Sequence, residues 1–364
     1  MATTTHDQLI HVQPTTLTVR TIPVYACGGG GINIGAALST LNAPTAEHAI
    51  PDVHYIDGSS QNLASIPEKD KDNVYIMRRR DGIDVLQHPD GEELKGGGGD
   101  RTFMMGIAAN EAKAVLKRWP ASDEMNVIIM TAAGSVGSTT DSQIFKQILA
   151  EGKPVIVILV SVNASTLRAA NTAKTWLTLM QFQKQSGNSA GVFNVINSGA
   201  SRSAEVEADN KVIEFWLVMS NVLSGLAHRL DARDIFNFLN FNQLFKTDPQ
   251  LLLVDAFPNG QAMAATKHQY TSIVGIQKED LASTDAADAV LANVLYTKLG
   301  IIASPNPPFT EAYLAARPLP DELMRELDSS ITSTQQTVAT SATGSKQQSA
   351  LLNRYIGDDD LGVM

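Results

Sequence analysis

The chain has 364 residues, with 28 Lys and Arg against 38 Asp and Glu, which gives a formal net charge of −10. An acidic chain argues against a protein that coats nucleic acid, because such binding needs clustered basic residues. Apolar residues make up 43% of the chain, enough for a real core, so global disorder is excluded. Cys27 is the sole cysteine, which excludes an intrachain disulfide and a cysteine-based zinc site.

No apolar run reaches the roughly 20 residues that a membrane span needs. We therefore expect a soluble protein of a reducing compartment, without a membrane or nucleic-acid partner. The length suggests two domains, or one large domain with an appendage.

Apolar runs and helical patterns alternate through the N-terminal half. Strands are predicted at 24–27, 53–57, 126–131, 154–162 and 191–196. Helices are predicted at 33–41, at 103–119, in a segment that ends near 150, and at 166–184. Strands that alternate with helices form a parallel sheet whose ligands bind at the carboxyl ends of the strands. The sequence therefore predicts an α/β fold.

A long apolar stripe then interrupts this alternation. Its residues recur three or four positions apart: Val212, Trp216, Met219, Leu223, Leu226 and Leu230. This spacing predicts one helix over 203–230, which either lies in a core or connects two domains. Further along, we expect a strand near 270–276, a helix at 285–299, a Pro-rich loop at 304–308 and a helix that starts at 321–327.

Three Gly-rich loops precede helical segments, at 28–31, 96–99 and 133–139. Glycine lets backbone N–H groups approach an anion closely, and a helix N-terminus adds a partial positive charge. One such loop is more often a tight turn than a site. Three of them favour a polyphosphate ligand.

The spacing of these glycines narrows the choice of ligand. A dinucleotide fingerprint needs Gly at positions 1, 3 and 6, which no register of 28–35 provides. Asp57 lies at a plausible distance for an acid that binds a ribose, so a dinucleotide-dependent enzyme stays open as an alternative. No Gly-Lys pair is followed by Ser or Thr, which excludes a P-loop. Backbone N–H groups would then supply most of the phosphate binding.

Asp231 and Asp234 follow the long apolar stripe and are three residues apart. If Asp231 opens a helix, both carboxylates share one face and can orient a water molecule. In the alternative interpretation, Asp231 is only an N-cap and Asp234 only a first-turn acid that complements the helix dipole. Spacing alone favours the second interpretation.

The order of these motifs resembles that of the tubulin/FtsZ superfamily, and most closely its phage tubulins, over residues 22–300. The matching segments are Gly28–Gly35, Asp57–Asn62, Gly96–Arg101, the Ala-Gly-Ser-Val-Gly-Ser segment at 133–138, and the Asp-x-x-Asp motif after a long helix. Departures from the family pattern occur at Asp100, Ala133, Ser135, Val136 and Arg229. They bear on nucleotide affinity and hydrolysis rate more than on the fold.

The resemblance implies GTP or GDP with Mg²⁺ on the phosphates, and no metal ligated directly by the protein. The implied nucleotide-binding residues are Gly29, Gly30, Gly31, Asn33, Asp57, Gly97, Gly98, Gly99, Asp100, Gly134, Ser135, Gly137, Ser138, Thr139, Asn163 and either Asp209 or Asn210 as the guanine reader. The implied catalytic residues are Asp231 and Asp234, acting on the GTP of the next subunit.

The resemblance also implies four parts. They are a GTP-binding domain at 1–202, a central helix at 203–230, a smaller α+β activation domain at 231–327 and a C-terminal helix with an acidic tail at 328–364. Residues 321–364 contain seven acids and three bases. In phage tubulins such a tail docks on a neighbouring subunit.

The expected protein is thus a GTPase that polymerises head to tail, works in the cytoplasm of a phage-infected bacterium and positions phage DNA there. A tubulin-like structural protein with little hydrolysis is a further alternative.

Overall fold

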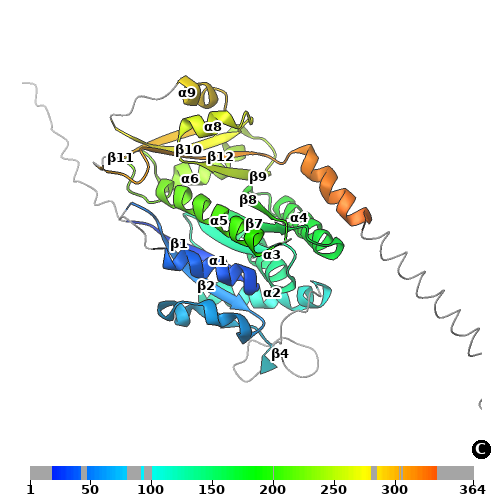
Figure 1. Cartoon of the computed structure of the whole chain (residues 1–364). Helices are drawn as coiled ribbons and strands as arrows, with labels where there is room; N and C mark the ends of the chain where they lie inside the picture. The colour runs from blue at the N-terminus through cyan, green and yellow to red at the C-terminus, as the bar shows by residue number, and fades with distance from the viewer. Residues whose placement is uncertain are drawn as a thin grey trace, which may run out of the picture.

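The computed structural model describes residues 19–41, 47–79, 92–93, 101–199, 201–279, 285–302, 304 and 306–333. Its centre is a ten-stranded sheet with the strand order β11-β10-β12-β9-β8-β7-β6-β1-β2-β3 (Figure 1). The strands of this sheet are β1 (Thr21–Cys27), β2 (Ile50–Asp57), β3 (Val74–Ile76), β6 (Asn126–Thr131), β7 (Val155–Val162), β8 (Ala190–Asn197), β9 (Leu251–Phe257), β10 (Ser272–Lys278), β11 (Tyr296–Ile302) and β12 (Glu311–Pro318).

The helices in the described residues are α1 (Gly28–Thr40), α2 (Arg101–Arg118), α3 (Ser135–Ala150), α4 (Thr166–Ser186), α5 (Arg202–Val222), α6 (Ala232–Leu239), α7 (Phe241–Phe245), α8 (Gly260–Ala265) and α9 (Asp285–Leu291). Two 3₁₀ segments, η1 (Ser60–Ser65) and η2 (Glu68–Asn73), follow β2. A two-stranded ladder joins β4 (Arg78–Arg79) to β5 (Glu92–Glu93). A final helix is described over 321–333. No helix among the described residues is long and apolar enough to cross a membrane.

The sheet is covered on both faces, as the α/β prediction requires. From β9 through β3 every neighbouring pair is parallel. Side chains alternate along a strand, so Val24 and Ala26 of β1 belong to the core beneath α1 and α5, whereas Tyr25 and Cys27 belong to the core beneath α2, α3 and α4. The α/β fold predicted from the sequence is confirmed.

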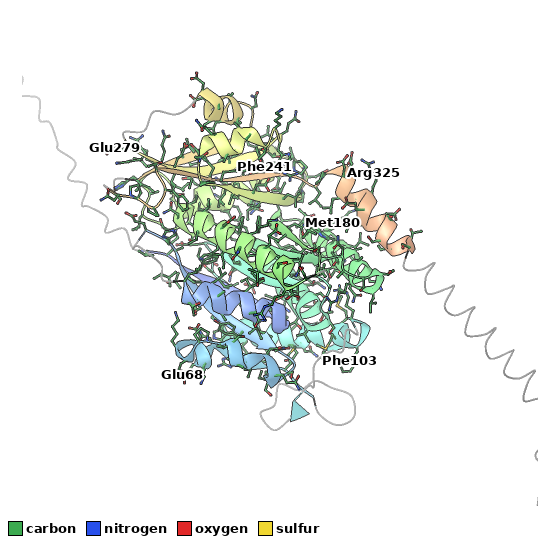
Figure 2. The ribbon with its side chains drawn as sticks, in the orientation of Figure 1. Glu68, Phe103, Met180, Phe241, Glu279 and Arg325 are labelled. Carbon is green, nitrogen blue, oxygen red and sulfur yellow. The ribbon has the colours of Figure 1, made fainter. Side chains whose placement is uncertain are left out.

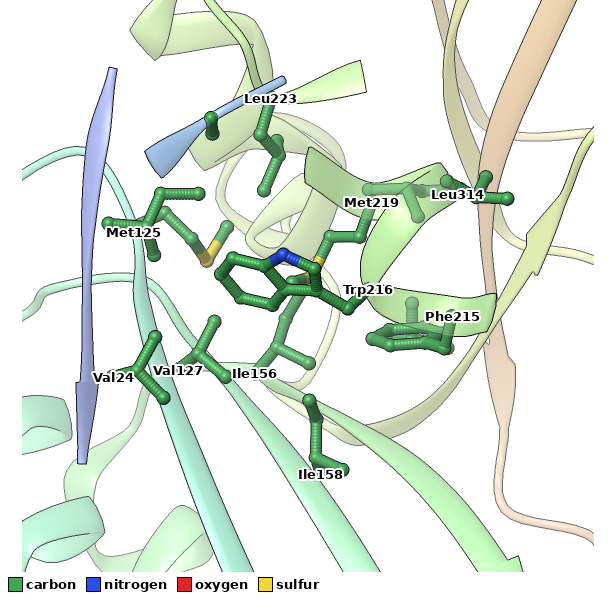
Figure 3. Packing of buried hydrophobic residues seen from close by; sticks show 14 of the residues in the cluster. Val24, Met125, Val127, Ile156, Ile158, Phe215, Trp216, Met219, Leu223 and Leu314 are labelled. Atoms are coloured by element: carbon green, nitrogen blue, oxygen red, sulfur yellow. The ribbon is translucent and has the colours of Figure 1, made fainter. Parts of the chain in front are cut away.

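Helix α5 packs across the first of these faces. Trp216 lies over the sheet residues Val127 and Ile156 (Figure 3), and the ring of Phe215 stacks on Phe193 of β8 with 3.9 Å between the centroids. The helix ends at Val222, so the prediction that it continues to Leu230 is wrong. Gly225 has φ of 81° and breaks the helix. Leu223 and Leu230 are nevertheless buried beyond its end, which is why the apolar stripe continues in the sequence.

The C-terminal strands extend the same sheet. β12 runs antiparallel to both β9 and β10, and β11 runs parallel to β10. The predicted helix over 285–299 is wrong beyond Leu291, because Tyr296–Ile302 pairs residue by residue with Ser272–Lys278. Backbone pairing with β10 replaces the helical hydrogen bonds there, and the aromatic and β-branched residues of the segment suit a strand.

The helix over 321–333 packs back on the N-terminal half through Leu327, which joins the core beneath α4. Met180 of α4 and Arg325 of this helix lie on the same side of the molecule (Figure 2). Phe241 is buried near the junction of α6 and α7, whereas Phe103 near the start of α2 is 40% exposed. The remainder of the expected C-terminal helix and acidic tail, residues 334–364, lies outside the described residues.

Candidate functional site

Two helices begin where neighbouring strands end. α1 follows β1 directly, and α3 follows β6 after three residues. Neither helix has a side-chain cap at its N-terminus, and neither has an acidic residue in its first turn. Free backbone N–H groups and two helix dipoles therefore point to one place, where an anion would be stabilised.

An elongated cleft opens at these two N-termini. One half has a volume of about 570 Å³ and is lined by residues that include Asn33, Asn171 and Asp209. The other half has a volume of about 270 Å³ and is lined by residues that include Asp57 and Gly137. Both halves share the lining residues Gly30, Thr131, Gly134 and Ser135. The cleft has the size of a small-molecule site and is mostly backbone at one end and side chains at the other.

Close packing explains why glycines line the smaller half of the cleft, at the N-termini of α1 and α3. A Cβ at Gly30 would lie 2.3 Å from Thr131 Cγ2, and one at Gly137 would lie 2.8 Å from the carbonyl oxygen of Cys27. Gly28 has φ of +69°, a conformation that favours glycine. The first turns of α1 and α3 can lie against the ends of β6 and β1 only because these side chains are absent, and their contact forms the floor of the cleft.

Asp57 lies at the end of β2 and is 2% exposed. Its Oδ1 accepts a hydrogen bond from the Gly58 N–H at 2.7 Å, and its Oδ2 accepts one from Asn62 Nδ2 at 2.6 Å. The segment Asp57–Asn62 is thus a hydrogen-bonded loop with Ser59, Gln61 and Asn62 also on the cleft wall. This confirms that the end of β2 adjoins the glycine loops.

The other end of the cleft contains acids from α5. Asp209 and Glu205 both line it, whereas Asn210 is exposed and does not. Burial raises the pKa of the Asp209 carboxyl, and the nearby charge of Glu205 adds to the rise. The sequence left open whether Asp209 or Asn210 contacts the guanine base. Of these two residues, only Asp209 lines the cleft.

Some sequence-predicted residues do not line the cleft. Gly31 is buried, and a Cβ there would lie 2.7 Å from the Ile129 carbonyl oxygen. The hydroxyl of Ser138 donates to the Gly134 carbonyl, and that of Thr139 donates to the Ser135 carbonyl at 2.6 Å. These two hydroxyls are turned to their own helix.

Asn163 is exposed and lines a separate hollow of about 570 Å³, beside Trp176 and Leu327. Gly29 does line the cleft. The remaining predicted residues, Gly97, Gly98, Gly99 and Asp100, lie outside the described residues.

The cleft residues that motif reasoning missed include Thr131, Arg168, Asn171 and Asn197. Thr131 and Asn197 are the last residues of β6 and β8, and the other two lie in the first two turns of α4. Only their position could have indicated these residues, because ligands of parallel sheets bind at the carboxyl ends of the strands.

Asp231 and Asp234 lie at the N-terminus of α6 and form a reciprocal capping box. Asp231 Oδ1 accepts from the Asp234 N–H at 2.9 Å, and Asp234 Oδ2 accepts from the Asp231 N–H at 3.1 Å. Both aspartates therefore cap α6, as the second interpretation expects. Asp234 also contacts Tyr296 and Lys298 of β11, which a helix cap alone does not require.

The cleft and the acidic motif lie at opposite ends of α5. Asp209 belongs to the first turns of α5, while Ser224, just beyond its end, accepts from the N–H of Arg20, which precedes β1. A helix of 21 residues is about 30 Å long. The two aspartates of one subunit therefore cannot reach a ligand in the cleft of that subunit.

Comparisons with known proteins agree with this geometry. A phage tubulin-like protein of Pseudomonas phage PhiPA3 is 27% identical over 239 residues, which is 65% of this chain and 67% of that protein. A protofilament structure of TubZ from bacteriophage PhiKZ superposes with a TM-score of 0.72 at 19% identity, covering 88% of this chain and 92% of the other.

A GDP-bound structure of the phage tubulin PhuZ gives a TM-score of 0.66 at 18% identity, covering 88% and 93%. No protein-family model matches the chain. The resemblance noted in the motifs is confirmed: the chain is similar in sequence to a phage tubulin-like protein and shares the fold of the phage tubulins.

Proposed function

We propose that this protein is a GTPase that assembles head to tail into filaments, with GTP in the cleft of one subunit and the water-activating carboxylates supplied by the next. The observation that carries the proposal is the separation of the cleft from Asp231 and Asp234 by the length of α5. A site completed between subunits makes hydrolysis depend on assembly, and a head-to-tail contact that does not close on itself gives an open filament.

The cleft fits a guanine nucleotide. The N-termini of α1 and α3 would bind the phosphates through backbone N–H groups, and Asp209 would accept from the N1 and N2 groups of guanine. Mg²⁺ would be held mainly by phosphate oxygens and water. Among the described residues, no group of three His, Cys, Asp or Glu side chains is arranged to hold a metal ion.

Hydrolysis would rest on position and charge. Phosphoryl transfer needs the nucleophile held in line and the developing charge stabilised. The helix N-termini would stabilise the phosphate oxygens, while a carboxylate of the next subunit would orient the attacking water.

Apolar side chains at both ends of the subunit support such an assembly. Leu167 (61% exposed) lines the cleft, and Ile196 (60% exposed) is the penultimate residue of the nearby strand β8. Leu244 and Phe245 of α7 are 47% and 45% exposed at the other end of the subunit, the acidic end that carries Asp231 and Asp234. There the side chains of Asn240 and Asn242 accept hydrogen bonds from Ser189, the residue before β8. Burial of both patches in each contact would favour a polymer.

The relatives agree with this proposal, since the PhiKZ protein is described as a protofilament and the PhuZ structure contains GDP. By the same similarity we propose that the filaments act in the cytoplasm of a phage-infected bacterium and position phage DNA there. The proposed domain division (1–202, 203–230, 231–327 and 328–364) is retained, with the central helix ending at Val222.

The test is Asp234→Asn, which keeps the size of the side chain and removes its charge. We expect GTP binding and sedimentable filaments to persist while phosphate release falls by about a hundredfold or more, as for removal of a transition-state contact. Phosphate release at the wild-type rate would overturn the catalytic role. Filaments with little release in the wild-type protein would instead favour a structural tubulin-like polymer.

A further inference from the structure

The carboxylate of Asp234 has two partners outside the capping box, both on β11. Tyr296 donates its hydroxyl to Asp234 Oδ1 at 3.0 Å, and Lys298 Nζ lies 3.3 Å from Asp234 Oδ2. The Asp234 side chain is 15% exposed and that of Lys298 is 40% exposed. These contacts therefore lie at the surface of the acidic end, where a neighbouring subunit can meet them.

β11 fixes the whole loop that carries the acids. His228 and Ile301 exchange two backbone hydrogen bonds of 2.8 Å each. Gly300 leaves room for this loop, since a Cβ there would lie 2.8 Å from the Cβ atoms of both Ala227 and Leu230. Tyr296 and Lys298 are two residues apart and so lie on the same face of the strand.

The donors are distributed unequally over the two carboxylate oxygens. Among the described residues, Oδ2 of Asp234 receives the Asp231 N–H and the Lys298 ammonium group, whereas Oδ1 receives only the Tyr296 hydroxyl. Each carboxylate oxygen has two lone pairs, so Oδ1 keeps one for a further donor. A water molecule bound there would have its position set by the orientation of the carboxylate plane.

The hydroxyl of Tyr296 remains a donor over the working pH range. Burial raises its pKa to about 12, and the hydrogen bond to Asp234 adds to the rise. A capping box needs only the two aspartates. The extra donors from β11 therefore fix the carboxylate plane.

We propose that Tyr296 and Lys298 are positioning residues for hydrolysis: they orient Asp234 so that its Oδ1 holds the attacking water in the cleft of the next subunit. This inference rests on the proposed function. It assigns to the C-terminal strands a part in the reaction that the two aspartates alone would not reveal.

The experiment compares Tyr296→Phe, Lys298→Met and Lys298→Arg with the control Thr297→Val. Thr297 lies between the two on the same strand and is exposed. GTP turnover per assembled subunit is measured well above the critical concentration, together with the KM for GTP, the critical concentration and the melting temperature. We expect turnover to fall between about tenfold and a hundredfold in Y296F and K298M, with KM and critical concentration unchanged. K298R recovers most of the rate, and T297V keeps all of it.

Wild-type turnover in both Y296F and K298M would overturn the inference. So would a loss of rate that follows a raised critical concentration or a lowered melting temperature, because that pattern marks a structural role. Asp234→Asn, assayed in parallel, separates this failure from failure of the proposed function. If D234N loses turnover while Y296F and K298M keep it, only the positioning role is wrong. If D234N also keeps it, the catalytic role of the motif is wrong.

Discussion

The two ends of α5 present opposite chemistry. At the cleft, the binding groups are backbone N–H groups at two uncapped helix N-termini, with glycines where side chains would clash. At the far end, the helix N-terminus of α6 is capped by its own aspartates, so its anion-binding capacity is already used. One end is built to accept negative charge and the other to present it. This contrast is the basis of the proposal that one site forms between the cleft of one subunit and Asp231 and Asp234 of the next.

We expect the largest effect from a substitution that adds a side chain at the glycine-lined end of the cleft. Gly30→Ala places a methyl group 2.3 Å from Thr131 Cγ2, so the first turn of α1 must shift away from the cleft floor. Overpacking costs about 1–3 kcal/mol, and we expect GTP affinity to fall by up to about a hundredfold. Equilibrium binding of a fluorescent GTP analogue measures it.

Two further variants control this result. Thr131→Ser removes the clashing methyl group, so the double variant G30A/T131S should recover binding. Gly106→Ala in α2 adds a methyl group with nothing within 4 Å, and should leave binding unchanged. Binding lost equally in G30A and in the double variant would show that the clash is not the cause.

A smaller effect is expected at the base-binding end. Asp209→Ala removes the carboxylate that would accept from guanine, and we expect the preference for GTP over ATP to fall about tenfold. Asn210→Ala, one residue along the same helix but exposed, should leave the preference unchanged. Competition binding with GTP and ATP decides between them. If Asn210→Ala lowers the preference and Asp209→Ala does not, Asn210 recognises the guanine.

The sequence predicted the strands and site residues of these two ends only where the pattern of the segment itself indicates them. Strands β1, β6 and β7 lie within three residues of their predicted bounds, because buried parallel strands are continuous apolar runs. β12 was missed, since its Ala-rich segment favours a helix and becomes a strand only by pairing with β9 and β10. Asp209 could be proposed from a motif. Thr131 and Asn171 could not, because their role depends on which strand ends meet.

The same limit applies at the acidic end. The spacing of Asp231 and Asp234 predicts a shared helix face, and the capping box confirms it. Their partners Tyr296 and Lys298 lie more than sixty residues further along, in a segment whose pattern was mistaken for a helix. Only the pairing of β11 with β10 brings them to the motif.

We expect the smallest effect on function from a substitution in α2, away from both the cleft and the acidic end. Glu111 of α2 is fully buried, and burial raises its pKa to about 7, although the nearby hydroxyl of Tyr75 opposes the rise. Between pH 4.5 and 7 the folded state keeps a proton that the unfolded state loses, so the free energy of unfolding falls as pH rises through this window.

Glu111→Gln should remove this contribution. Relative to wild type, the variant should gain stability on the order of 3 kcal/mol between pH 5 and pH 8, with GTP turnover unchanged. Urea unfolding at the two pH values measures the gain. Parallel pH dependences in the two proteins would contradict the assignment, and altered turnover would mean that the α2–α3 layer is not independent of the two ends.

The most direct test asks whether the two ends of different subunits form one site. Asp234→Asn subunits are loaded with γ-labelled GTP and mixed with excess wild-type protein and excess unlabelled GTP, so that any label that dissociates is diluted. If the carboxylate acts on the neighbouring subunit, wild-type subunits will release labelled phosphate from the variant's cleft within one turnover. If the label stays in GTP although the mixture assembles, each subunit hydrolyses only its own nucleotide, and the account is wrong.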